Sequence, residues 1–199
     1  MKKLYLLAIS LVLVLLTACG GETAPPENDT NTNDTTQSQE GTVELLEVRD
    51  ALEVFAEGVE AEVFDIDTGL TFRVKRTTGG YSTLADVEPL TTEDTETMLY
   101  IAGGRWNRIR RPVIITVGER RIAASLTPFP HFGCDDNPHG VVVDNRSGGT
   151  GTGINLNSIR DNGITGVVDI YFFNSLQPGI NRPCEMHQEA VLRAYDFEE

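Results

Sequence analysis

Apolar residues recur at steps of three and four in three parts of the chain, a spacing typical of amphipathic helices. These parts are residues 43–57, 92–102 and a stretch near 184–195. The middle part has the clearest ends, because Thr91 can cap its first turn and Gly103 can end it. We therefore expect about three helices.

Elsewhere apolar and polar residues alternate, as they do in half-buried strands. Residues 61–76 and 113–125 each alternate on both sides of a central turn with a glycine, which indicates two hairpins. Residues 141–144 and 167–173 are further strand candidates. Helices and hairpins in this order predict an α+β fold with a mainly antiparallel sheet in a single compact domain.

The first residues have the order of an export signal. Lys2 and Lys3 precede an apolar run at 4–16, which is shorter than the roughly 20 residues that a membrane-spanning helix needs. The run ends in LTACG at 16–20, which resembles the bacterial lipobox, with a bulky apolar residue and two small ones before the cysteine. The alternatives are an ordinary signal peptide with an incidental cysteine, or a short membrane helix. We expect cleavage after residue 18 and a lipid on Cys19, which would anchor the protein to the outer face of the bacterial cytoplasmic membrane.

Residues 20–42 are almost entirely polar and cannot bury enough apolar surface to offset the entropy lost on ordering. The expected organisation is therefore a signal peptide at 1–18, the lipidated cysteine with a disordered linker at 19–42, and one domain at 43–199. The chain has a net charge of −14, which argues against nucleic acid and against adsorption to anionic lipid. The membrane contact should thus be the lipid anchor itself.

Basic residues nonetheless cluster around the single tryptophan. Arg105, Arg110 and Arg111 lie close to Trp106 in the sequence. Arginine forks suit carboxylates and phosphates, so this group is a candidate site for peptidoglycan or another wall polymer. The alternative is a solvated strand face whose arginines pair with nearby acids.

Two cysteines remain once Cys19 carries lipid. Cys134 and Cys184 should pair, because disulfides persist in exported domains. With free thiols, His131-x-x-Cys134 and Cys184-x-x-His187 would have the spacing of four zinc ligands. The oxidising compartment favours the disulfide, so we expect neither a metal nor a cofactor.

Two histidines and one carboxylate are the candidate catalytic residues. If the disulfide ties the loop after His131 to the last helix, His131 and His187 lie in one neighbourhood, and Asp169 on a central strand can join them as a general acid–base set or a metal-binding set. The alternative is that both histidines are structural. The glycine-rich run at 148–153 is expected to be a flexible surface loop rather than a cradle for an anion.

A series of short phrases follows in a fixed order along residues 61–194. They read VFD at 63–65, TG at 68–69, ADVEPLT at 85–91, EDT at 93–95, GRW at 104–106, RRP at 110–112, RIAAS at 121–125, PH at 130–131, HQ at 187–188 and AV at 190–191. In this order they resemble a domain of unsettled activity found in exported and wall-associated proteins of Firmicutes, often beside peptidoglycan-binding modules.

The chain departs from this resemblance at several of the histidines and at the cysteine that recur in the similar proteins. Similar proteins read H-A-D where this chain has LAD at 84–86, and H-F-C-I-H-F where it has VVDIYF at 167–172. A further T-H is missing near 177–178. Of the recurrent histidines only His131 and His187 remain, and Asp169 stands where the others have a cysteine that resembles a nucleophile.

These observations lead to three hypotheses about function. The first is a lipid-anchored envelope protein that binds a wall-derived ligand, or assists envelope assembly, without strong catalysis. The second is a peptidoglycan hydrolase or peptidase that uses His131, Asp169 and His187. The third is a structural interaction module.

Overall fold

A computed structural model describes residues 41–77 and 83–198, all of which belong to a compact unit spanning 39–199. The expected signal peptide, the lipidated Cys19 and nearly all of the linker lie outside the described residues. Within the described part of the chain, no helix is both long and apolar enough to cross a membrane. The elements, in chain order, are β1 (Val43–Glu44), α1 (Val48–Val54), β2 (Glu60–Asp65), β3 (Leu70–Arg76), β4 (Ala85–Pro89), α2 (Thr92–Ile101), β5 (Arg111–Val117), β6 (Arg120–Phe132), β7 (Val142–Arg146), a 3-10 turn η1 (Ser147–Gly149), β8 (Gly151–Ile154), β9 (Gly166–Tyr171) and α3 (Glu185–Tyr195).

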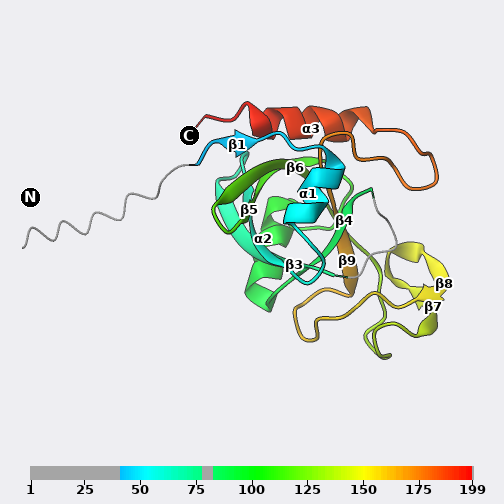
Figure 1. Cartoon of the computed structure of the whole chain (residues 1–199). Helices are drawn as coiled ribbons and strands as arrows, with labels where there is room; N and C mark the ends of the chain where they lie inside the picture. The colour runs from blue at the N-terminus through cyan, green and yellow to red at the C-terminus, as the bar shows by residue number, and fades with distance from the viewer. Residues whose placement is uncertain (1–40, 78–82, 199) are drawn as a thin grey trace, which may run out of the picture. The chain divides into compact units, whose positions relative to one another are not determined.

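Six strands close into an antiparallel barrel. They follow the order β6-β5-β2-β3-β4-β9, and β9 pairs again with β6. The short β1 adds to β6 in parallel, and β7 pairs with β8 in a separate two-stranded sheet (Figure 1). The predicted α+β fold with a mainly antiparallel sheet is confirmed.

The barrel interior forms the main core. Alternate residues of the strands, such as Phe72, Leu126 and Ile170, point inward and are fully or almost fully buried. On the outside, Val191 and Ala194 of α3 pack against β5 and β6 in a second, smaller core (Figure 1). The outer face of β6 is therefore covered by α3.

Two of the three predicted helices are present where the spacing placed them. α2 begins after Thr91, whose hydroxyl accepts a hydrogen bond from the Asp94 backbone at 3.1 Å. The final helix is α3. The prediction for residues 43–57 was wrong at its start, because Val43 and Glu44 pair with β6 and the helix covers only Val48–Val54.

Both predicted hairpins are present, as β2–β3 and β5–β6. However, β6 continues to Phe132, beyond the predicted end of the hairpin at residue 125, because its second half pairs with β9. The strands β4 and β8 were not predicted. β4 carries Asp86 and Glu88, and acidic residues are unfavourable in strands unless specific partners hold them.

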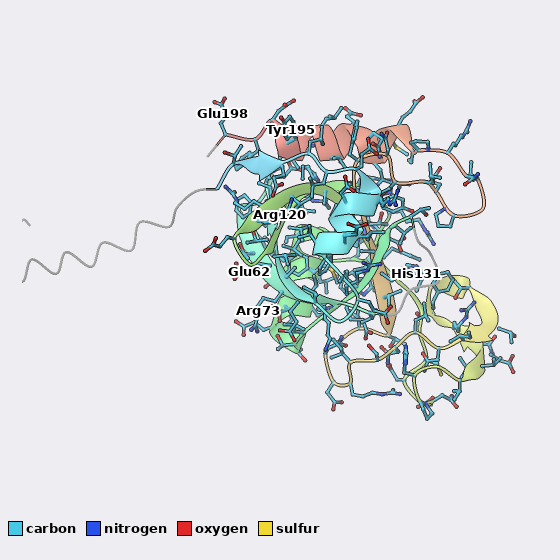
Figure 2. All side chains as sticks on the ribbon, viewed as in Figure 1. Glu62, Arg73, Arg120, His131, Tyr195 and Glu198 are labelled. Atoms are coloured by element: carbon cyan, nitrogen blue, oxygen red, sulfur yellow. The ribbon has the colours of Figure 1, made fainter. Side chains whose placement is uncertain are left out.

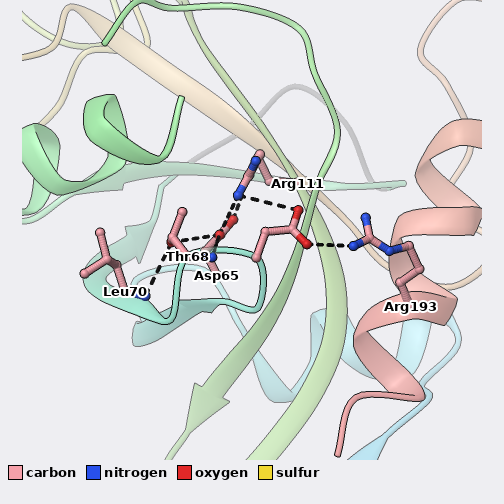
Figure 3. A network of polar contacts seen from close by, with 6 residues as sticks. Asp65, Thr68, Leu70, Arg111 and Arg193 are labelled. Carbon is pink, nitrogen blue, oxygen red and sulfur yellow. Dashed lines mark hydrogen bonds and ion pairs between the residues drawn. The ribbon is translucent and has the colours of Figure 1, made fainter. Parts of the chain in front are cut away.

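A buried carboxylate ties the β2–β3 turn to β5 (Figure 3). Asp65 is fully buried and accepts hydrogen bonds from the Arg111 Nε at 2.8 Å and Nη2 at 2.6 Å. It also accepts from the backbone and hydroxyl of Thr68, both at 2.9 Å. Two residues on, Asp67 accepts from Arg193 of α3 at 2.6 Å, which fastens that helix to the same turn.

We predict that Asp65→Asn lowers the free energy of unfolding by about 3 kcal/mol, because it leaves the largely buried Arg111 without its main charge partner. Urea unfolding of the full chain measures the loss. Asp67→Asn is the matched control, since Asp67 is partly exposed and its loss should cost less than about 1 kcal/mol. Equal losses from the two variants would contradict this interpretation.

Candidate functional site

Three neighbouring strands place polar residues in one row on the outside of the barrel. Asp169 of β9 lies directly opposite Asp86 of β4 and directly opposite Thr127 of β6. Directly opposite residues of antiparallel strands project from the same face. Because the adjacent Leu126 and Ile170 point into the core, this row projects outward.

His131 joins the row beyond an irregularity in β6. The pairing register with β9 shifts between Thr127 and His131, and this shift brings His131 Nε2 to 3.3 Å from Asp169 Oδ1. One imidazole nitrogen of His131 and one carboxylate oxygen each of Asp86 and Asp169 all lie within 4.8 Å of one another. We call these three residues the acid–histidine cluster.

The acid–histidine cluster is only partly accessible to solvent. Asp86 is fully buried, whereas the side chains of His131 and Asp169 are 11% and 20% exposed. Figure 2 shows His131 on the side of the barrel next to the β7–β8 sheet. A small molecule could therefore reach the cluster at Asp169 and His131, but not at Asp86.

The other ring nitrogen of His131 fixes its orientation. Nδ1 lies 3.0 Å from the Phe129 carbonyl, which can only accept, so Nδ1 carries a proton and donates it. Burial alone would lower the pKa of His131. The hydrogen bond and charge of Asp169 outweigh burial, with smaller contributions from Phe129 and Asp86, so the pKa is raised above its usual value.

The backbone around His131 leaves no room for larger neighbours. A Cβ on Gly148 would lie 2.6 Å from the His131 Cβ, and a Cβ on Gly166 would collide with the His131 carbonyl oxygen. Phe132, directly after His131, has a φ of 61°, which is uncommon for a large residue. Gly148 belongs to the glycine run expected to form only a flexible surface loop, and here it packs against the site.

Gly148 and Gly149 offer a matched test of this packing. Both have a φ near +70°, but only a Cβ at Gly148 meets His131, while one at Gly149 meets nothing within 4 Å. Gly149→Ala should therefore cost only the strain of its backbone, roughly 1–2 kcal/mol. Gly148→Ala should cost at least about 1 kcal/mol more, by overpacking, and should also shift the His131 ring signals in NMR spectra. Unchanged His131 signals in Gly148→Ala would contradict the packing argument.

His187 lies apart from the acid–histidine cluster. On α3 it is buried, with Nδ1 2.9 Å from the Ser125 hydroxyl and Nε2 3.3 Å from the Thr127 hydroxyl. Its ring stacks on Tyr171 with a centroid distance of 3.6 Å. Burial, assisted by the charge of Arg110, lowers the pKa of His187 to about 3. It is a neutral histidine with satisfied nitrogens.

The expected set of His131, Asp169 and His187 is therefore only partly present. The structure brings His131 and Asp169 together, but Thr127 occupies the place beside Asp169 and bonds to His187. Asp86 takes the third position instead. Asp86 was not among the expected site residues, although Ala85 and Asp86 are the two residues of the H-A-D phrase that this chain retains.

The lowered pKa of His187 predicts a loss of stability in acid. The unfolded chain binds a proton at this histidine near pH 6.5, whereas the folded protein does so only near pH 3. Its contribution is thus fully present above about pH 6.5 and is lost as the pH falls toward 3, at up to about 1.4 kcal/mol per pH unit. Urea unfolding of wild type and His187→Gln at pH 7, 5 and 4 measures the difference. Parallel curves for the two proteins would contradict the buried neutral state.

The expected disulfide is absent, because Cys134 and Cys184 are both free thiols. Cys134 follows the end of β6 that pairs with Gly166, while Cys184 begins α3 at the other end of β9, near Tyr171. A six-residue strand separates these ends by about 17 Å, and a disulfide requires Cα atoms within about 7 Å. The same separation rules out the four-ligand zinc arrangement of His131, Cys134, Cys184 and His187.

The arginine group around Trp106 divides between structural and surface roles. Arg111 is held by Asp65, and Trp106 packs against the core. Arg105 is exposed. Arg110 donates to the Arg108 carbonyl, and its Nε is buried without a hydrogen-bond partner among the described residues. Of the four expected ligand-binding residues, Arg110 alone lines a groove of about 370 Å³, together with Arg108, Ile109, Met186, Glu189, Ala190 and Arg193.

Searches with this chain found no matching family model, no matching curated protein and no matching solved structure. The function of the site must therefore be inferred from its own geometry and chemistry.

Proposed function

We propose that this chain is a lipid-anchored protein of the outer face of the cytoplasmic membrane that hydrolyses a bond in a wall-derived substrate at the acid–histidine cluster. One observation carries the proposal. Residues 86, 131 and 169, far apart in the sequence, meet at one partly exposed place on three adjoining strands. The lipobox-like residues at 16–20 support the location.

The residue types favour water as the nucleophile. Asp169 occupies the place opposite His131 Nε2 that a serine or cysteine nucleophile would need, and it stands where the resembled proteins have cysteine. A carboxylate there can take a proton from water while the water oxygen bonds to the substrate carbon, and then return that proton to the leaving group. Direct hydrolysis thus needs no covalent intermediate.

The groove lined by Arg108, Arg110 and Arg193 supports a substrate that carries carboxylates. Arg110 lies close enough to Tyr171 and His187 to affect the pKa of both. Tyr171 is two residues from Asp169 on the same face of β9. The groove therefore lies toward the Tyr171 end of β9, on the side of the cluster where His187 is, and its guanidinium groups can hold a peptide carboxylate there.

Binding without turnover is the second candidate function. It is favoured by the full burial of Asp86 and the low exposure of the other two side chains. In that case the cluster would orient a ligand, and the groove would supply most of the contact.

Digestion of purified peptidoglycan tests the proposal directly. Asp169→Asn should lower the rate of peptidoglycan hydrolysis at least about 100-fold, because it removes the proton acceptor without changing the side-chain shape. His187→Gln should retain activity, since His187 contacts Ser125, Thr127 and Tyr171 rather than the cluster. Equal muropeptide profiles from wild type and Asp169→Asn would exclude hydrolysis at this site. Muropeptide binding without digestion would support the second candidate.

A further inference from the structure

The geometry points to a divalent-cation site of the zinc type, in which Asp86, His131 and Asp169 are the three protein ligands. The inference rests on the proposed function, because it concerns the same cluster and assigns how water is activated there. It also replaces the expectation from the sequence that the protein holds no metal. Binding of the ion can be measured without any substrate.

The donor atoms suit such an ion. One imidazole nitrogen and two carboxylate oxygens are ligands that Zn²⁺ accepts readily, and Mn²⁺ accepts a similar set. Three protein ligands leave a fourth position for water, which is the arrangement of catalytic rather than structural zinc. The ligands also come from three paired strands, which hold them more rigidly than loops would.

The distances within the cluster are compatible with a shared ion. Two ligand atoms about 2.0–2.1 Å from one tetrahedral ion lie about 3.4 Å apart. The His131 Nε2 to Asp169 Oδ1 distance is 3.3 Å, close to this spacing. The separations within the whole cluster, at most 4.8 Å, require only small side-chain shifts to close around an ion.

His131 is oriented as metal ligands are. Its Nδ1–H donates to the Phe129 carbonyl, so Nε2, which can bind an ion once it has released its proton, is the nitrogen that faces the two carboxylates. A carbonyl or carboxylate that accepts from the second nitrogen is the usual outer contact of a metal-bound histidine. The close approach of Gly148 to the His131 Cβ keeps the ring in this position.

The charges of the cluster also favour a cation. Two carboxylates lie close together beside His131, so negative charge is concentrated at the cluster. A divalent ion between them neutralises that charge. It also lowers the pKa of a bound water toward 7, and a carboxylate oxygen that does not bind the ion can take the released proton.

Calorimetric titration of Zn²⁺ into the full chain, stripped of metal with a chelator, tests the inference. We expect one ion per chain at this site, and binding at least about 100-fold weaker in Asp169→Asn, since loss of an outer contact alone weakens such sites about 10–100-fold. Asp161→Asn is the matched control, because Asp161 is exposed and lies outside the cluster, and Asn also tolerates its φ of 58°. This control should bind as wild type does.

A second variant and a second signal guard against a folding artefact. His131→Asn should also lose the tight site, and Co²⁺ should give visible d–d absorption in wild type that both cluster variants lack. Each variant is first checked for an unchanged circular dichroism spectrum. Tight binding retained by Asp169→Asn would place the ion outside the cluster and overturn the inference, as would no binding to wild type.

The outcomes also separate this inference from the proposed function. Zinc binding that depends on Asp169, without peptidoglycan digestion, would sustain the metal site and exclude the hydrolase. If the metal-free protein in excess chelator digests peptidoglycan at an undiminished rate, the hydrolase is supported and a role for the metal ion in it is excluded.

Discussion

β9 pairs with β4 on one side and with β6 on the other, and this double pairing both closes the barrel and assembles the site. It sets Asp169 directly opposite Asp86 and directly opposite Thr127. The shift of register in β6 then carries His131 to Asp169 without displacing the rest of the strand. A slip of one residue in either pairing would turn these side chains into the core. Barrel closure and site geometry are therefore one constraint.

His187 and His131 lie on the same face of the sheet, but their immediate surroundings give them different protonation states. His187 is covered by α3, bonds to two hydroxyls and stacks on Tyr171, so the uncharged ring is the stable form. His131 is nearly as buried, but it faces carboxylates and donates to a carbonyl, so a positive charge is favoured. Thr127 lies next to both groups and separates the neutral contacts from the charged ones. A cation, whether proton or metal ion, therefore belongs only on the His131 side.

Much of the fold followed from local patterns, because alternation and helical spacing are properties of short segments. Both hairpins, α2 and α3 were predictable for that reason. The segment after Thr127 was not, since a sequence with two prolines and a histidine is typical of a loop and becomes a strand only through its partner β9. Asp86 was missed for a related reason: its role depends on lying opposite Asp169, 83 positions along the chain. The disulfide prediction was wrong because it rested on the expected export of the domain and on the number of cysteines. Neither says which end of a strand each cysteine occupies.

In this interpretation, closure of the barrel by β9 builds one cation-binding cluster from β4, β6 and β9. An anomalous difference map from crystals soaked in Zn²⁺ reports directly on that cluster. We expect a peak bounded by His131 Nε2 and by carboxylate oxygens of Asp86 and Asp169, at about 2.0–2.2 Å from each. A peak at Cys134 or Cys184 with none at the cluster, or a density map in which Asp169 does not lie beside Asp86, would contradict it.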